Sequence, residues 1–309
     1  MKRLRPSDKP AANFRIKYTL KDKRPTDASK ATGYKWLTRQ ESSMKPQDLP
    51  EHRLSHSTGK VAGLLYSLCC YLCFLLTALY LMGFLSGIGV PKDIDSGPSL
   101  DWRLATLVDT LLITLFAVQH SGMARKGFKQ WWTHFIPAPI ERATYVLVTC
   151  LVLVLLFWLW QPIRASIWRL ESAWTQGMLT GVFWIGWGVI LLATFLISHF
   201  ELLGIKQALD AWRSPKPENP TFKTPLLYKL VRHPLYLGFL IVFWATPSMT
   251  AGHLLFAALS TLYVLIGVHL EERDLVELFG EDYRRYRQRV AMLVPLIKRK
   301  PDASSNQQK

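Results

Sequence analysis

Charge is missing from long stretches of this 309-residue chain, and residues 61–85 contain no Asp, Glu, Lys or Arg. A helix needs about 20 mostly apolar residues to cross a bilayer, and several windows of the sequence meet or approach that length. A soluble single-core protein would interleave charged and apolar residues, and a disordered chain would lack such apolar runs. The absence of charge therefore excludes both classes and indicates a multi-pass membrane protein.

Cysteine is also scarce, with four residues in the whole chain. Cys69, Cys70 and Cys73 lie in the first apolar window and Cys150 lies in the third, so they do not form the disulfide framework of a secreted domain. Cys69 and Cys73 share a helix face, but that window has no histidine or carboxylate to complete a metal site. We expect these cysteines to pack, and we expect no metal.

The motifs of common soluble enzymes are absent. The sequence contains no GxGxxG after a strand, no Walker sequence, no HExxH and no GxSxG. The usual nucleotide-binding architectures are therefore excluded. An enzyme built from membrane helices has to bind a cofactor between those helices and its cytoplasmic segments.

Basic residues are abundant at the amino-terminal end. The chain has 38 Lys and Arg against 22 Asp and Glu, and residues 1–60 alone hold 15 basic and 6 acidic residues without an apolar signal-peptide core. The pattern predicts a mostly disordered cytoplasmic tail. Attraction to anionic membrane lipid explains its charge better than binding to nucleic acid, so no nucleic-acid partner is expected.

The apolar windows predict an all-α, multi-pass transmembrane fold with four spans and a carboxy-terminal helical hairpin. The first hairpin arm crosses the membrane only if its helix begins near Pro225 and bends at Pro234, so five to six membrane helices are expected. The predicted spans are residues 61–85, 104–120, 143–160 and 177–198, and the hairpin arms are residues 235–246 and 253–270.

Loop charge predicts the topology. Arg125, Lys126, Lys129 and Arg142 surround a Trp-Trp pair after the second span, as in cytoplasmic loops. Both termini are then cytoplasmic. The expected organisation is a basic tail (1–60), transmembrane helices one to four (61–200), a loop, hairpin and amphipathic helix (201–297) and a disordered tail (298–309). In the amphipathic helix, the apolar face comprises Tyr283, Tyr286, Val290, Leu293 and Ile297.

Two groups of polar residues mark the expected cytoplasmic ends of the hairpin. One is Arg232-His233-Pro234 with Tyr236 and Gly238, and the other is Glu271-Glu272. Ionisable residues at membrane helix ends often mark function, and a carboxylate there can bind hydroxyl or amino groups of a ligand. The alternatives stay open at this point: the first group also suits a membrane-entry turn, and Arg232 and Glu272 also suit a structural ion pair.

Two further groups lie on the second and fourth spans. His199, Leu203 and Lys206 share a face if the fourth helix continues, with Glu201 nearby. Asp109, Phe116 and His120 fall on one stripe of the second span, beside Gln119. For Asp109, a place on a substrate path and a hydrogen bond between helices are equally favoured.

Three segments together resemble the membrane methyltransferase superfamily of isoprenylcysteine carboxyl methyltransferase and the phospholipid N-methyltransferases. They are LYKLVRHPLYLG, EERDL and FGEDYRRYRQRV, separated by the apolar hairpin. The resemblance implies that S-adenosylmethionine binds at the cytoplasmic face. By the same resemblance, the cofactor-binding residues are Arg232, His233, Pro234, Tyr236, Gly238, Glu271 and Glu272, with Tyr283 and Tyr286 closing the pocket. Lys206 is added to them from the fourth-span group.

Upstream segments, among them FAVQHSGMAR and ISHFELLGIKQ, resemble the bacterial family of methanethiol S-methyltransferases. The implied reaction is methyl transfer to a small thiol, giving dimethyl sulfide, in an enzyme expected in the bacterial inner membrane. The thiolate is the nucleophile, so His199 or His120 is expected to accept the proton, and Arg232 or Lys206 to stabilise the anion. Tyr236 and Trp244 are candidates to contact the sulfonium.

Two alternatives remain at this stage. A member of the same fold can methylate a prenylated thiol, a carboxylate or a lipid amine. A non-catalytic transporter or assembly partner can use Asp109 and His120 as a polar pathway instead.

Overall fold

The computed structural model describes residues 57–213, 222 and 224–295. The predicted basic tail lies almost wholly outside these residues, as does the tail at 298–309. Within the described part, five helices are long and apolar enough to span a membrane. They are α2 (Ser57–Ser86), α3 (Trp102–Ala124), α5 (Ala138–Leu159), α6 (Ala173–Ile197) and α10 (Ala251–Phe279). The predicted all-α membrane fold is confirmed.

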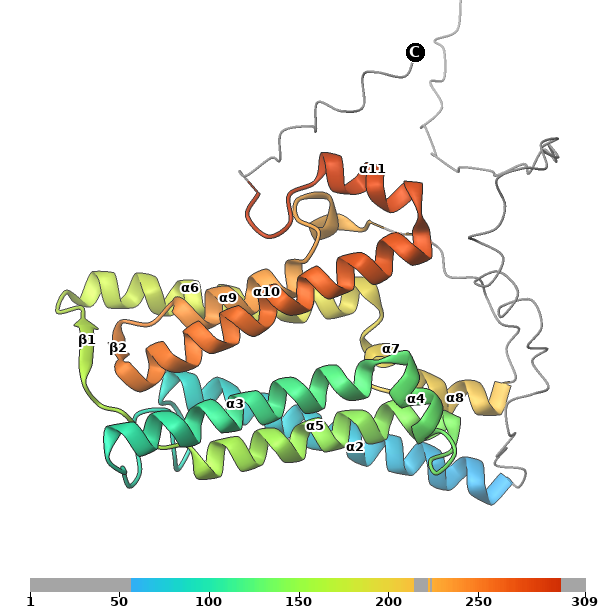
Figure 1. Ribbon diagram of the computed structural model, residues 1–309, viewed down its shortest axis with the longest axis horizontal. Helices are drawn as coiled ribbons and strands as arrows, with labels where there is room; N and C mark the ends of the chain where they lie inside the picture. Colours follow the sequence, from blue (N-terminus) through green and yellow to red (C-terminus); the bar gives the residue numbers. More distant parts are fainter. Residues whose placement is uncertain (1–56, 214–221, 223, 296–309) are drawn as a thin grey trace, which may run out of the picture. The chain divides into compact units, whose positions relative to one another are not determined.

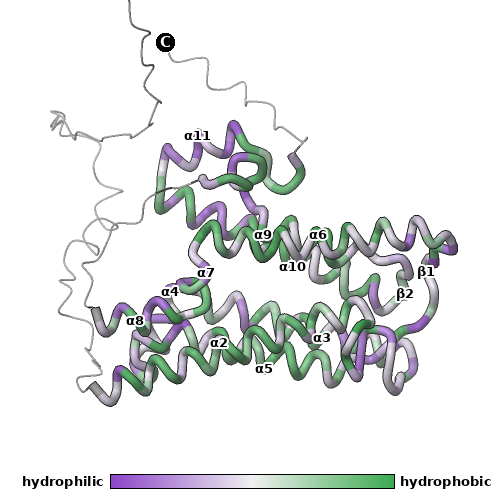
Figure 2. The backbone as a smooth tube through the Cα atoms, turned by 180° about the vertical axis from the view of Figure 1, so that it is seen from behind, coloured by the Kyte–Doolittle hydropathy of each residue, from purple (hydrophilic) through white to green (hydrophobic). Residues whose placement is uncertain are grey.

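The long helices pack in two groups (Figure 1). Helix α5 packs against α2 and α3, while α9 (Pro234–Trp244) packs between α6 and α10. Contacts between α10 and α3 join the two groups. Figure 2 shows that the long helices of both groups are mostly apolar, whereas α11 (Glu281–Arg289) is mostly polar. Apolar side chains remain exposed along the long helices, as a lipid-facing surface requires.

Glycines allow α6 and α9 to approach closely. A Cβ atom on Gly238 would lie 2.9 Å from the carbonyl oxygen of Gly186, and one on Gly186 would lie 3.1 Å from the carbonyl oxygen of Gly238. Small residues at such crossings are the usual means by which membrane helices bring their backbones together. Gly238 therefore contacts another helix through the face that would carry its side chain.

Helix α9 differs from the expected first arm of the hairpin. It has 11 residues and begins at Pro234, and a short 3₁₀ helix, η1 (Leu226–Lys229), precedes it. The condition for a crossing by this arm, a helix from near Pro225 with a bend at Pro234, is therefore not met. Proline disfavours the helical conformation in the residue before it, and His233 has an extended φ of −128°. Proline suits the first turn of a helix, so α9 starts there without a kink.

At one end of the helices, a small cap joins the loops. Strand β1 (Ser166–Arg169) pairs antiparallel with β2 (Ser248–Thr250), and neither strand was expected from the sequence. Asp109 lies at this end, where one of its carboxylate oxygens accepts the backbone N–H of Gln161 at 2.8 Å. Asp109 therefore bonds to the segment that follows α5, and its other carboxylate oxygen is buried without a hydrogen-bond partner among the described residues.

The other end carries short helices that the sequence pattern did not resolve. They are α4 (Lys126–Trp132), α7 (His199–Leu202) and α8 (Ile205–Arg213). Gly204 separates α7 from α8 with a φ of +87°, a conformation that favours glycine. His199 and Lys206 therefore lie on different helices, and the expected shared face is wrong.

The carboxy-terminal amphipathic helix is shorter than expected. Helix α11 ends at Arg289, and Ala291 forms a parallel bridge with Val231. Tyr283 is buried on this helix, whereas Val290 and Leu293 follow it in extended and turn segments. Ile297 lies outside the described residues. The segment after α11 therefore pairs with Val231, Arg232 and His233, directly before α9.

Candidate functional site

Arg232 connects the start of α9 to both α10 and the end of α11. Its Nε atom donates to the Glu272 carboxylate at 2.6 Å, and its Nη1 atom donates to the carbonyl oxygens of Arg287 at 3.0 Å and Val290 at 2.6 Å. The side chains of Arg232 and Glu272 are 7% and 8% exposed. A buried ion pair with this many hydrogen bonds holds three segments in one arrangement.

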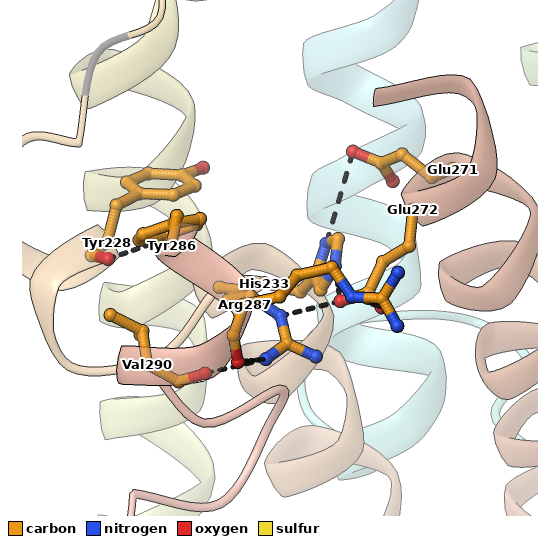
Figure 3. Close-up of polar contacts among 8 residues, drawn as sticks. Tyr228, His233, Glu271, Glu272, Tyr286, Arg287 and Val290 are labelled. Carbon is orange, nitrogen blue, oxygen red and sulfur yellow. Dashed lines mark hydrogen bonds and ion pairs between the residues drawn. The ribbon is translucent and has the colours of Figure 1, made fainter. Parts of the chain in front are cut away.

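His233 lies between the two glutamates (Figure 3). Its Nε2 atom is 3.3 Å from the Glu272 carboxylate, and its Nδ1 atom is 4.0 Å from the Glu271 carboxylate. Glu272 also forms an ion pair with Arg287 at 3.4 Å, so protein groups surround it. The Glu271 side chain is 44% exposed and remains accessible to a ligand. The adjacent glutamates thus differ: Glu272 is bound by protein groups, whereas the carboxylate of Glu271 is accessible to a ligand.

Tyrosines from α9, α11 and η1 surround this cluster. Tyr236 makes a ring contact with His233 and interacts with the Glu271 carboxylate. Tyr286 donates its hydroxyl to the carbonyl oxygen of Tyr228 (Figure 3), and burial raises the pKa of Tyr286 to about 12. The Tyr283 hydroxyl is buried and has no hydrogen-bond partner among residues 57–213, 222 and 224–295. An unpaired buried hydroxyl is costly unless a ligand or water satisfies it.

The structure brings together most of the residues predicted for the cofactor site. His233, Tyr236, Glu271 and Glu272 are in mutual contact, and Tyr283 interacts electrostatically with both glutamates. Pro234 begins α9 directly beside them.

The remaining predicted residues of the cofactor site lie in other contacts. Gly238 contacts α6 instead of this cluster. Lys206 forms an exposed ion pair with Glu201 at 2.9 Å, and that hydrogen bond lowers the pKa of Glu201. Trp244 donates its indole N–H to Thr261 at the far end of α9.

His120 lies in a second polar cluster inside the helices. The Tyr145 hydroxyl is 2.9 Å from its Nδ1 atom and 3.0 Å from its Nε2 atom, and Thr149 Oγ1 is 3.5 Å from Nδ1. Ser121, the next residue on α3, donates a hydrogen bond to the hydroxyl of Tyr263 on α10 at 3.2 Å. An imidazole and four hydroxyl groups within membrane helices are expensive to bury, and such groups commonly mark a functional site.

His199 lies in a different environment. Tyr71 Oη is 3.0 Å from its Nε2 atom, and Thr194 Oγ1 is 3.0 Å from its Nδ1 atom. Phe195 stacks on its ring with centroids 4.3 Å apart. Burial lowers the pKa of His199, which keeps the imidazole neutral near pH 7. Both nitrogens have hydroxyl partners, as those of His120 do, so the two histidines differ in their location and not in their hydrogen bonding.

Tyr263 and Tyr145, in the second cluster, were not singled out from the sequence. Tyr263 lies on α10, the helix that carries Glu271, and α10 packs against both α9 and α3. A spacing signal did exist for Tyr263, because Tyr263, Gly267 and Glu271 recur every four residues on α10 and so share a helix face. A single tyrosine in an apolar span is usually interpreted as a packing residue. Only its shared face with Glu271, two turns further along the helix, indicates a role for Tyr263 at the site.

Known proteins resemble this chain over most of its length. Methanethiol S-methyltransferase from Pseudomonas sp. strain GM41 is 69% identical over 252 residues, which are 82% of this chain and 97% of the relative. Methanethiol S-methyltransferase from Pseudomonas deceptionensis is 62% identical over 258 residues, 84% of this chain and 98% of the relative. Nurim from Xenopus laevis is a more distant relative, 29% identical over 238 residues, 65% of this chain and 82% of the relative. No protein-family model and no solved structure matches the chain.

Proposed function

We propose that this chain, which belongs to the methanethiol S-methyltransferase family, transfers a methyl group from S-adenosylmethionine to methanethiol and releases dimethyl sulfide. The observation that carries the proposal is its high identity to two such enzymes along nearly their full lengths. The five long apolar helices place the activity in a membrane. Methanethiol is small and membrane-permeable, so it can reach a site between such helices.

The cluster around His233 fits S-adenosylmethionine. The accessible carboxylate of Glu271 suits the ammonium or ribose hydroxyl groups of the cofactor, and the buried Tyr283 hydroxyl lacks a protein partner in the described part of the chain. The Tyr236 ring suits a sulfonium, because cations are attracted to aromatic faces. Arg232 and Glu272 bind each other, so we assign them to the framework that holds these groups in place.

The proposed reaction needs a base and a dry site. When bound, S-adenosylmethionine supplies a methyl group on a positively charged sulfur, and the electron pair of the broken bond stays on that sulfur. The sulfur of methanethiol forms the new bond to carbon as it loses its proton to the protein. Attack of a thiolate on a cation neutralises charge, so excluding water favours it. Packed helices around the His120 cluster can provide such exclusion.

We propose His120 as the base. It contacts Tyr145, and Phe116 stacks on it and meets Tyr263, which lies two turns before Glu271 on α10. His199 instead contacts Tyr71 on α2 and Thr194 and Phe195 on α6. Arg232 directs its Nε and Nη1 atoms to protein partners. We therefore assign Arg232 a structural role, and not the stabilisation of the thiolate.

The proposed orientation places α4, α8 and α11 at the cytoplasmic face of a bacterial inner membrane. Basic residues support it, because Arg125, Lys126 and Lys129 lie at the end of α3 and in α4. Arg142 lies near the start of α5 at the same end. With this orientation, the His233 cluster faces the compartment that contains S-adenosylmethionine, and both termini are cytoplasmic.

The function is tested with the purified full-length protein in lipid nanodiscs, supplied with S-adenosylmethionine and methanethiol. We expect gas chromatography to detect dimethyl sulfide in the headspace, formed at a rate proportional to the protein concentration. A boiled sample and a sample without S-adenosylmethionine are the controls. Equal dimethyl sulfide in all three samples would remove the substrate assignment.

A further inference from the structure

We propose that Tyr145, Thr149 and Tyr263 form the binding site for the small thiol, in which Tyr145 positions His120 to take the thiol proton. The inference rests on the proposed function and assigns residues that have no role in it so far. These residues come from α5 and α10, and His120 comes from α3, so the site lies where the two groups of helices meet.

The position of the cluster suits a methyl acceptor. Tyr263 lies two turns before Glu271 on α10, and α10 packs against both α9, which carries Tyr236, and α3, which carries His120. An acceptor held between Tyr145 and Tyr263 would therefore lie near the cofactor cluster. The two sulfur atoms have to come this close to meet across the transferred carbon.

The polar groups of the cluster are not all satisfied by protein. Thr149 Oγ1 is within 3.4 Å of the Gln119 Nε2 atom and 3.5 Å of the His120 Nδ1 atom. The Gln119 Oε1 atom is buried and has no hydrogen-bond partner within the described ranges. A thiol is a weak hydrogen-bond donor, and an unpaired acceptor beside an imidazole is a suitable place for it.

Aromatic rings supply the apolar part of the site. The Phe116 ring stacks on His120 with centroids 5.4 Å apart and meets the Tyr263 ring edge-on at 5.8 Å. Divalent sulfur makes favourable contacts with aromatic rings. Large, closely packed rings oppose longer alkyl chains, so the same residues are expected to set the preference for a small thiol.

Contacts on its other side hold Tyr145 in place. The Cζ atom of Arg142 lies 5.5 Å from the centroid of the Tyr145 ring, and Arg142 Nε donates to the carbonyl oxygen of Leu202 at 3.0 Å. Arg142 also lines a cavity of about 270 Å³ with Ser198 and Glu201. A tyrosine fixed in this way can hold the His120 ring in one orientation, which defines it as a positioning residue.

The first test compares Tyr145→Phe with Tyr80→Phe in nanodiscs. Both variants lose one hydroxyl hydrogen bond, but the Tyr80 hydroxyl donates to the carbonyl oxygen of Lys92 at the cap end. We expect Tyr145→Phe to lower kcat about 10- to 100-fold, as part of an acid–base effect of about 100- to 10,000-fold. S-adenosylhomocysteine affinity should be unchanged by calorimetry. The loss should shrink with trifluoroethanethiol, a more acidic thiol that needs the base less. Equal kcat for Tyr145→Phe and wild type, or equal losses with both thiols, would overturn the positioning role.

The second test measures the choice between thiols. We expect Tyr263→Ala to raise the ratio of kcat/KM for propanethiol to that for methanethiol about 10-fold or more, because each methylene in an apolar pocket is worth roughly 10- to 200-fold. The ratio should stay at the wild-type value in Tyr80→Phe. An unchanged ratio in an active Tyr263→Ala protein would overturn the thiol site. A wild-type protein that methylates no thiol would instead contradict the proposed function itself.

Discussion

Replacing Glu272 with alanine is expected to abolish dimethyl sulfide formation and to destabilise the protein more than any other single change at the site. Glu272 is the buried partner of Arg232; it also accepts a hydrogen bond from His233 and forms an ion pair with Arg287. Removing one member of a buried ion pair leaves the other charge uncompensated, at a cost of about 3 to 5 kcal/mol. The released Arg232 would also loosen its hold on the end of α11.

Three variants separate stability from cofactor binding. Thermal unfolding in detergent should occur at a clearly lower temperature for Glu272→Ala than for wild type. Glu271→Ala should keep the wild-type unfolding temperature, because this side chain is half-exposed, but should bind S-adenosylhomocysteine more weakly. Glu277→Ala, an exposed change on the same helix, should match wild type in both measurements. Wild-type stability in Glu272→Ala would contradict the structural role of the ion pair.

Replacing His120 with asparagine is expected to lower kcat about 100-fold or more with methanethiol. Asparagine retains polar contacts but cannot take a proton, and general base catalysis is typically worth about 100- to 10,000-fold. Residual activity then depends on thiolate formed in solution. The rate of His120→Asn should therefore keep rising at alkaline pH, where the wild-type rate has levelled.

Two other histidines give matched controls. His134→Asn changes an exposed residue whose Nδ1 atom contacts the Gln130 carbonyl oxygen, so activity should be unchanged. His199→Asn removes a ring held by Tyr71 and Thr194, so the expected loss is in the unfolding temperature, with S-adenosylhomocysteine binding and pH dependence retained. The opposite pattern, with a changed pH profile for His199→Asn and none for His120→Asn, would identify His199 as the base.

The membrane helices were readily predicted because lipid imposes a simple requirement on sequence. A run without charge such as residues 61–85 has few other structural explanations, and the helix Ser57–Ser86 contains it entirely. Boundaries set by local chemistry were harder. Pro234 was expected to bend a helix, but the restriction that it places on His233 starts a new helix instead.

The cofactor cluster was partly predictable and the second cluster much less so. Resemblance to a family marked His233 and Glu271, because their sequence neighbours are distinctive. The fourth span was expected to continue to Lys206, but α6 ends at Ile197 and Gly204 follows the separate helix α7, so Lys206 does not share a face with His199. Tyr263 lies in a span of apolar residues, where its contact with Ser121 depends on how α10 packs on α3. Helical spacing alone does not specify such contacts between helices.

The most direct test of the proposed reaction traces the methyl group from S-adenosylmethionine to dimethyl sulfide. Purified protein in nanodiscs is given S-adenosylmethionine with a deuterated methyl group and unlabelled methanethiol, and the headspace is analysed by mass spectrometry. The account predicts dimethyl sulfide that carries one deuterated methyl group from the wild-type protein, and at least about 100-fold less of it from His120→Asn. Unlabelled dimethyl sulfide, or none from a folded protein that binds S-adenosylhomocysteine, would contradict it.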